Sequence, residues 1–142
     1  MKKLVTLLLM FTLGTFMSQA QSAVGKWKTI DDETGEAKSI VEIYEKNGKI
    51  YGKVIDILNP AKKNAVCKEC KGADKNKPIL GLVILKDLTK EGNEWTGGQI
   101  LDPNKGKLYK CTVTLEGKDK LNVRGYVGIS LIGRTQTWQR VQ

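Results

Sequence analysis

Short runs in which apolar and polar residues alternate are the feature of this sequence that most constrains its fold. The runs are rich in Val, Ile, Thr, Tyr and Trp, and Gly, Asn and Asp separate them. Alternation with a period of two places every second side chain on one face of a β-strand. No segment of ten or more residues shows convincing helical periodicity. The pattern predicts strands over 24–30, 38–46, 49–58, 81–88, 95–102, 107–116, 119–127 and 132–141.

Turn residues indicate how these strands are connected. Asn47-Gly48 is a strong signal for a two-residue hairpin, and the segment 102–106 has a Pro and a Gly in positions typical of a longer turn. Eight short strands joined by such turns favour an antiparallel up-and-down barrel, with a β-sandwich as the alternative. An eight-stranded barrel has room inside for side chains or for one small ligand.

Successive loops of an up-and-down barrel lie at opposite ends. The tight loops 47–48, 89–94 and 117–118 would share one end, and the loops 31–37, 59–80, 103–106 and 128–131 would share the other. Because the second end has both long loops, we expect any opening to the barrel interior there.

The N-terminal segment predicts export. Lys2 and Lys3 precede an uncharged, mostly apolar stretch over 4–17, which has the length of a signal peptide core and is short for a membrane span. Small residues at Ser18 and Ala20 suit cleavage after residue 20. We therefore expect a signal peptide over 1–20 and a mature domain over 21–142, in the periplasm or outside the cell, with an uncleaved N-terminal anchor as the alternative.

Composition excludes several kinds of chemistry. The chain contains no histidine, which rules out a histidine base, a Ser-His or Cys-His nucleophile and a histidine metal site. The net charge is +9, or +7 without residues 1–20, which contain two lysines and no acidic residue. This charge suits an anionic lipid or lipopolysaccharide surface. Scattered lysines and few aromatic residues argue against nucleic acid. We expect no cofactor, no metal and no catalytic residue.

The three cysteines are expected to be structural. Cys67 and Cys70 form a single C-x-x-C, which lacks two of the four ligands that a structural zinc site needs. We expect a disulfide between them that stiffens the loop 59–80. The alternatives are a pairing of either one with Cys111, or a redox role. Alternation in the sixth strand turns Cys111 inward, so we expect a buried and inert thiol.

Two charged loops lie at the open end. The loop 59–80 is rich in lysine, and we expect a solvated basic surface or a lid over the barrel opening that attracts anions. The acidic segment 31–36 lacks the spacing of a calcium loop, and we expect a solvated turn that pairs with the basic lid.

The last strand has the most informative pattern. Arg134, Gln136, Trp138 and Arg140 share one face by the period of two, and an inward Trp138 turns both arginines inward. Arg134 lies near the open end, where it serves an internal salt bridge or a ligand. In the seventh strand, Arg124 and Tyr126 face outward unless a bulge at Gly125 reverses them.

These residues resemble a known superfamily. Gly25-Lys26-Trp27 in the first strand and Trp138-Gln139-Arg140 in the last are similar to the lipocalin (calycin) signature. In that superfamily an arginine of the last strand packs over the tryptophan at the closed end of the barrel. The resemblance implies that Gly25, Trp27 and Arg140 form a structural plug.

A closer resemblance extends over nearly all of the mature chain. It is to the bacterial exported domain-of-unknown-function family 2147, which is similar to lipocalins in shape and implies no particular activity. The motifs that carry it are Gly25-Lys26-Trp27, Ile50-Tyr51-Gly52-Lys53, Cys67-Lys68-Glu69-Cys70, Gly98-Gln99-Ile100-Leu101-Asp102-Pro103, Arg124-Gly125-Tyr126 and Gly133-Arg134-Thr135-Gln136-Thr137-Trp138.

The sequence thus predicts an all-β, eight-stranded, lipocalin-like barrel that binds rather than catalyses. Our first hypothesis is an exported protein that holds a small amphipathic or lipid-like ligand in the barrel. The candidate ligand-binding residues are Arg134, Gln136, Trp138, Tyr109 and Ile100. The alternative is a filled barrel whose basic surface and loops bind an envelope partner. No transmembrane span is expected in the mature chain.

Overall fold

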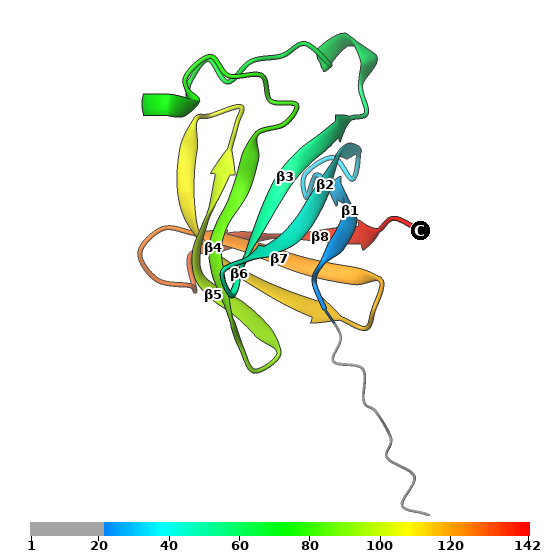
Figure 1. Ribbon diagram of the computed structural model, residues 1–142, viewed down its shortest axis with the longest axis vertical. Helices are drawn as coiled ribbons and strands as arrows, with labels where there is room; N and C mark the ends of the chain where they lie inside the picture. The colour runs from blue at the N-terminus through cyan, green and yellow to red at the C-terminus, as the bar shows by residue number, and fades with distance from the viewer. Residues whose placement is uncertain (1–21) are drawn as a thin grey trace, which may run out of the picture.

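Eight antiparallel strands close on themselves in the computed structural model, which describes residues 22–142 (Figure 1). The expected signal peptide over 1–20 lies outside the described residues. Each strand pairs with the next, and β8 returns to β1, so the predicted all-β up-and-down barrel is confirmed. The strands are β1 (Gly25–Ile30), β2 (Ala37–Lys46), β3 (Lys49–Ile57), β4 (Val83–Glu91), β5 (Glu94–Asp102), β6 (Lys107–Glu116), β7 (Lys120–Tyr126) and β8 (Gly133–Arg140).

The connection between β4 and β5 is shorter than the sequence indicated. The two strands continue past Leu88 to a turn at Gly92 and Asn93, so the predicted loop over 89–94 was wrong. Most side chains of this extension are polar and exposed, so it shows no alternation of apolar and polar residues. Gly92 supplies the positive φ, 63°, that the tight turn needs.

The half of the barrel nearest the closed end is filled by its own side chains. Trp27 and Trp138 are fully buried there, together with Leu88, Val113 and Leu121. Trp95 is buried as well, although the sequence pattern did not place it in the core. These side chains fill the interior of the closed half, and a hollow of about 260 Å³ remains at this end beside Ser22 and Trp95.

The long loop between β3 and β4 packs against the outside of the barrel. Ile84 and Leu101 point outward from neighbouring strands, yet both are buried, so another segment must cover them. Two short 3-10 turns, η1 (Pro60–Lys62) and η2 (Gly72–Asp74), shape the loop. At its centre, the buried Cys67 lies against the carbonyl oxygen of Pro103 in the β5–β6 turn, with 3.3 Å between Sγ and O.

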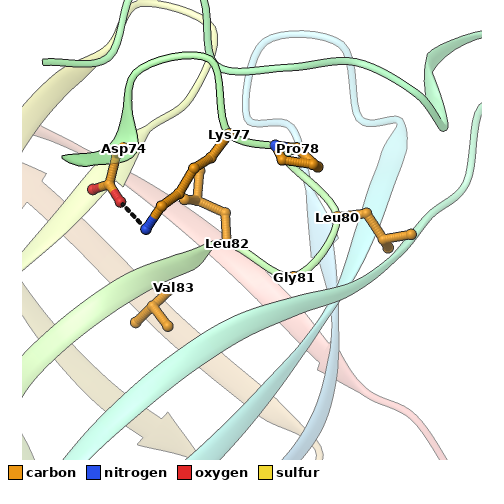
Figure 2. A pocket seen from close by; sticks show the side chains of 7 residues that line it. All are labelled: Asp74, Lys77, Pro78, Leu80, Gly81, Leu82 and Val83. Atoms are coloured by element: carbon orange, nitrogen blue, oxygen red, sulfur yellow. Dashed lines mark hydrogen bonds and ion pairs between the residues drawn. The ribbon is translucent and has the colours of Figure 1, made fainter. Parts of the chain in front are cut away.

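Asp74 fixes the far part of this loop. It accepts hydrogen bonds from Lys77 of the loop and from Lys86 of β4, at 3.4 and 3.3 Å. Beside this pair is a shallow hollow of about 210 Å³, which Pro78, Leu80 and neighbouring residues line (Figure 2). The polar groups that flank the hollow already bond one another, so they are not free to orient a ligand. These contacts attach the loop to the outer wall of the barrel. They do not support the lid, which was one of the two expectations for this loop.

Arg140 joins the two ends of the chain at the closed end. Its guanidinium lies 4.2 Å from the centre of the Trp27 ring. It donates hydrogen bonds to the main-chain oxygens of Ser22, Val24 and Lys118, at 2.9, 3.1 and 2.6 Å. The Trp27 indole N–H donates to the oxygen of Ala23 at 2.8 Å. This clamp holds the segment before β1 across the bottom of the barrel.

We expect Arg140→Ala to lower the free energy of unfolding by about 2–4 kcal/mol, because it removes three charge-assisted hydrogen bonds and uncovers Trp27. Arg140→Lys keeps the charge without the planar fork, and it should recover only a small part of the loss. Urea unfolding followed by tryptophan fluorescence measures both variants. Equal stability of the alanine variant and the wild type would contradict the role of the clamp.

The cysteines give a second prediction. A disulfide joins Cys67 and Cys70, as predicted, and Cys111 is free and buried. Burial raises the pKa of the Cys111 thiol to about 12, which keeps it protonated and inert. The native protein should therefore react with almost no thiol reagent, and the unfolded, unreduced protein with one equivalent. Three equivalents would show that the disulfide is absent in solution.

Candidate functional site

The half of the barrel nearest the open end is lined less tightly than the closed half. Ile100, Tyr109, Gly125 and Gln136 face the interior here, and all four are only partly buried. Trp138 lies one step deeper on the same face of β8 as Gln136 and is buried. We call this region the mouth; Ile100 and Tyr109 form its apolar wall and Trp138 its floor.

A compact turn brings acidic side chains to the rim of the mouth. The Asp31 carboxylate accepts hydrogen bonds from the main-chain N–H groups of Glu33 and Thr34, at 2.9 and 3.0 Å. The main chain of Asp31 also bonds Gly35 and Glu36. These bonds lower the pKa of Asp31 and fix the loop between β1 and β2. Asp32 and Glu33 are thereby held at the tip.

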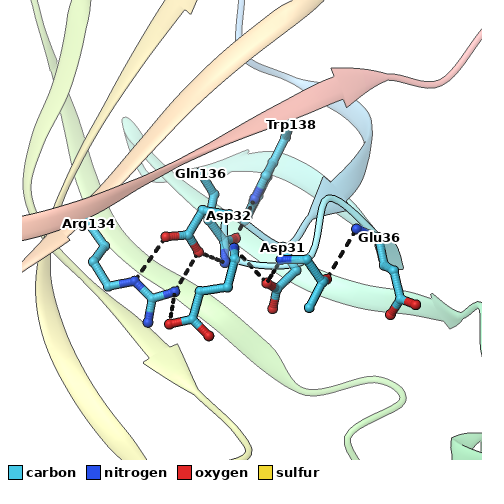
Figure 3. A network of polar contacts seen from close by, with 8 residues as sticks. Asp31, Asp32, Glu36, Arg134, Gln136 and Trp138 are labelled. Carbon is cyan, nitrogen blue, oxygen red and sulfur yellow. Dashed lines mark hydrogen bonds and ion pairs between the residues drawn. The ribbon is translucent and has the colours of Figure 1, made fainter.

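Asp32 forms a two-pronged ion pair with Arg134 (Figure 3). Arg134 Nε and Nη2 donate to the two carboxylate oxygens of Asp32 at 2.9 and 2.7 Å. Nη2 also lies 3.1 Å from Glu33 Oε1. The arrangement is the bidentate geometry in which a guanidinium binds a carboxylate most strongly.

A chain of hydrogen bonds runs from this ion pair to the floor of the mouth. The Gln136 amide nitrogen donates to Asp32 at 3.5 Å, and its oxygen accepts the Trp138 indole N–H at 3.0 Å. The only inward polar group of Trp138 is therefore satisfied by a neighbour on its own strand. Displacing Gln136 would leave that buried donor without a partner, which is unfavourable.

The ion pair also joins two strands whose main chains pair only briefly. The ladder between β1 and β8 consists of Trp27 with Arg140 and Lys28 with Gln139, both near the closed end. Towards the mouth, the side-chain bonds of Asp32 with Arg134 and Gln136 connect β8 to the β1–β2 loop, which follows directly on β1. We call this junction of the first and last strands the seam. Arg140 makes contacts at its closed end, and Arg134 makes contacts at its open end.

A second cation lies at the rim. The Lys107 ammonium is 5.3 Å from the centre of the Tyr109 ring, in a cation–π contact. Among residues 22–142, Lys107 takes part in no salt bridge. The mouth therefore has one cation that carboxylates neutralise and one that faces only an aromatic ring.

Four of the five predicted ligand-binding residues line this mouth. Arg134, Gln136, Tyr109 and Ile100 surround it, whereas Trp138 lies beneath them and is covered. The acidic turn was expected to pair with the basic loop, and this was wrong for Asp32, whose partner is Arg134. Lys107 was not predicted. A signal for the ion pair was present, because the loop count put the acidic turn and Arg134 at the same end.

Two further observations concern residues 22–142. They contain no group of three or more His, Cys, Asp and Glu side chains that could hold a metal ion. None of their helices is both long enough and apolar enough to span a bilayer.

Comparison of the sequence with known protein families gives a match. Residues 25–140 match the family described as "uncharacterized protein conserved in bacteria (DUF2147)". The chain belongs to this family. Among solved structures, protein HP1028 from the human pathogen Helicobacter pylori, described as belonging to the lipocalin family, is similar. The two are 25% identical with a TM-score of 0.77, over 87% of this chain and 85% of that one. No curated protein matches the sequence.

The DUF2147 chain thus has a lipocalin-like barrel, as its sequence predicted. In lipocalin terms, the clamp of Trp27 and Arg140 lies at the closed end and the ion pair of Arg134 and Asp32 lies at the open end.

The ion pair gives a prediction on pH. Hydrogen bonds from Arg134 lower the pKa of Asp32 below its ordinary value of 3.8. A lowered pKa in the folded state means that the pair stabilises the mouth above pH 3.8 and is lost only as the pH falls through the lower value. Titration of the Asp32 carboxyl by NMR should give a midpoint below 3.8. Arg134→Ala should move it upward, and a midpoint at or above 3.8 in the wild type would contradict the pair.

Proposed function

We propose that this DUF2147 protein is an exported, non-enzymatic binding protein whose mouth holds a small amphipathic ligand with an anionic head. The observation that carries the proposal is the change in lining along the barrel. Large buried side chains fill the interior of the closed half, whereas Ile100, Tyr109 and Gln136 at the mouth are only partly buried and lie beside cations at the rim. Such a combination of apolar surface and a few polar groups is typical of ligand sites.

The depth of the site limits the ligand. Trp138 is buried beneath the mouth, so a bound tail extends only as far as this floor. Ile100 and Tyr109 supply the apolar contacts for the tail. A short apolar tail suits this depth better than a long acyl chain.

We expect the anionic head group to bind by displacing a carboxylate of the protein from Arg134. Arg134 already binds two carboxylates from the β1–β2 loop, and half of its side chain is exposed. An anionic ligand can take the place of Asp32 on the guanidinium without leaving Arg134 unpaired. Lys107, at the start of β6, adds a second attraction.

Export is supported by two features. The segment 1–20 has the composition of a signal peptide. The disulfide between Cys67 and Cys70 is compatible with an oxidising compartment.

Substitutions at the two ends of the ion pair should have opposite effects on an anionic ligand. Arg134→Ala should weaken binding of a fluorescent short-chain fatty acid by about ten- to a hundredfold, because one charge-assisted hydrogen bond contributes roughly 1.5–3 kcal/mol. Asp32→Asn should strengthen binding, because it removes the competing carboxylate. Fluorescence titration measures both.

Thermal melting distinguishes this result from a structural effect. Both substitutions affect a pair at the surface, so the melting temperature should change little. Arg124→Ala, on the outer face of β7, is the matched arginine control and should leave the affinity unchanged. No saturable binding in the wild type, or weaker binding in Asp32→Asn, would contradict the proposal.

A further inference from the structure

The loop between β7 and β8 exposes an unusual amount of apolar surface. Seven large apolar side chains among residues 22–142 are strongly exposed, and four of them lie in this one loop. They are Val127, Ile129, Leu131 and Ile132, with exposed fractions of 55, 60, 85 and 68%. Isolated exposed apolar residues are ordinary, but a contiguous group marks a contact with a partner or a membrane.

The loop is held outward by its surroundings. It projects from the barrel wall at the end of the orange strand β7 (Figure 1). Arg124 donates to the oxygen of Ser130 at 2.8 Å and to Thr135 Oγ1 at 2.9 Å, and the N–H of Ile132 bonds the oxygen of Ile129. The apolar side chains are thus presented to solvent on a formed turn.

We infer that this loop, residues 127–132, inserts into the surface of an anionic phospholipid bilayer. The shape favours lipid over a protein partner. A specific protein interface needs about 20–30 residues a side, whereas the loop is a short, protruding tip that a fluid apolar layer can surround. The loop contains no acidic residue.

The charge around the loop favours an anionic surface. Lys110 and Tyr126 are cross-strand partners on the outer face, at the base of the loop. Lys110 and Arg124 take part in no salt bridge among the described residues. A tyrosine and basic residues beside an apolar tip are the arrangement that suits the head-group layer. Two acidic residues of the neighbouring β1–β2 loop, Asp32 and Glu33, face Arg134 instead.

The position of the loop has a consequence for the mouth. The loop connects β7 to β8, and Arg134 is the second residue of β8. Insertion of the tip therefore brings the mouth to the lipid surface. The inference does not depend on what the barrel binds.

Vesicle binding tests the inference. The full mature chain should sediment with vesicles of phosphatidylcholine and phosphatidylglycerol, and more weakly with phosphatidylcholine alone. Leu131→Ser should reduce the bound fraction at least about tenfold, because Leu131 is the most exposed of the four side chains. The matched control is Leu80→Ser, which removes an exposed leucine outside the loop and should bind as the wild type does.

Two further measurements distinguish insertion into lipid from a contact with protein. The native tryptophans are all buried, so the emission of Leu131→Trp reports on the loop and should shift to the blue on vesicle binding. Lys110→Gln should weaken binding only to the vesicles that contain phosphatidylglycerol. Titration with the fluorescent fatty acid in solution should be unaffected by Leu131→Ser, which keeps this test apart from that of the mouth.

Three outcomes would overturn the inference. The first is no binding of the wild type to either kind of vesicle. The second is equal binding of Leu131→Ser and Leu80→Ser. The third is a wild-type dimer in the ultracentrifuge that Leu131→Ser converts to a monomer, with no vesicle binding, which would assign the loop to a contact between two copies of the chain.

Discussion

The bond between the first and last strands is the constraint on which the rest of this barrel depends. A row of eight strands leaves two edges, and only their pairing removes the exposed N–H and C=O groups. In this protein, the main-chain ladder between β1 and β8 is short. Arg140 compensates by binding main-chain oxygens on both sides of the closed end while its guanidinium covers Trp27. The clamp therefore closes off the filled, closed half of the barrel.

The two inward arginines of β8 have the same chemistry and different partners. Arg140 donates to carbonyl oxygens of the main chain, which are neutral and fixed by the fold. Arg134 donates to carboxylates on a loop, and a carboxylate from outside has the same shape and charge. In the proposed function, one strand thus carries a permanent contact at one end and an exchangeable contact at the other. The difference lies in the acceptor, since the donor is identical.

The sequence predicted the barrel because its signals are local. Alternation and turn residues identified all eight strands, and the C-x-x-C spacing identified the disulfide. The extension of β4 and β5 beyond Leu88 was not predictable in this way, because its side chains are mostly polar and its pairing comes from the main chain.

The candidate site was only partly predictable because it depends on distant residues. The period of two put Arg134 and Gln136 on an inner face, but Asp32 lies 102 positions from Arg134. Only the closed topology brings them together. The packing of the long β3–β4 loop against the outer wall, by contrast, did have a signal in the sequence. The run from Leu82 to Leu85 is apolar at every position, as expected of a strand covered on both faces.

The short seam also has a consequence for how we expect the barrel to assemble. Each hairpin joins neighbouring residues, whereas the bond from Arg140 to Ser22 spans 118 positions. Contacts that close such a long stretch of chain form late, because the entropy of closure must be overcome before they contribute. We therefore expect the seam to form late during folding and to open early during unfolding. If so, the hydrogen bonds of Arg140 affect the lifetime of the native barrel more than its rate of folding.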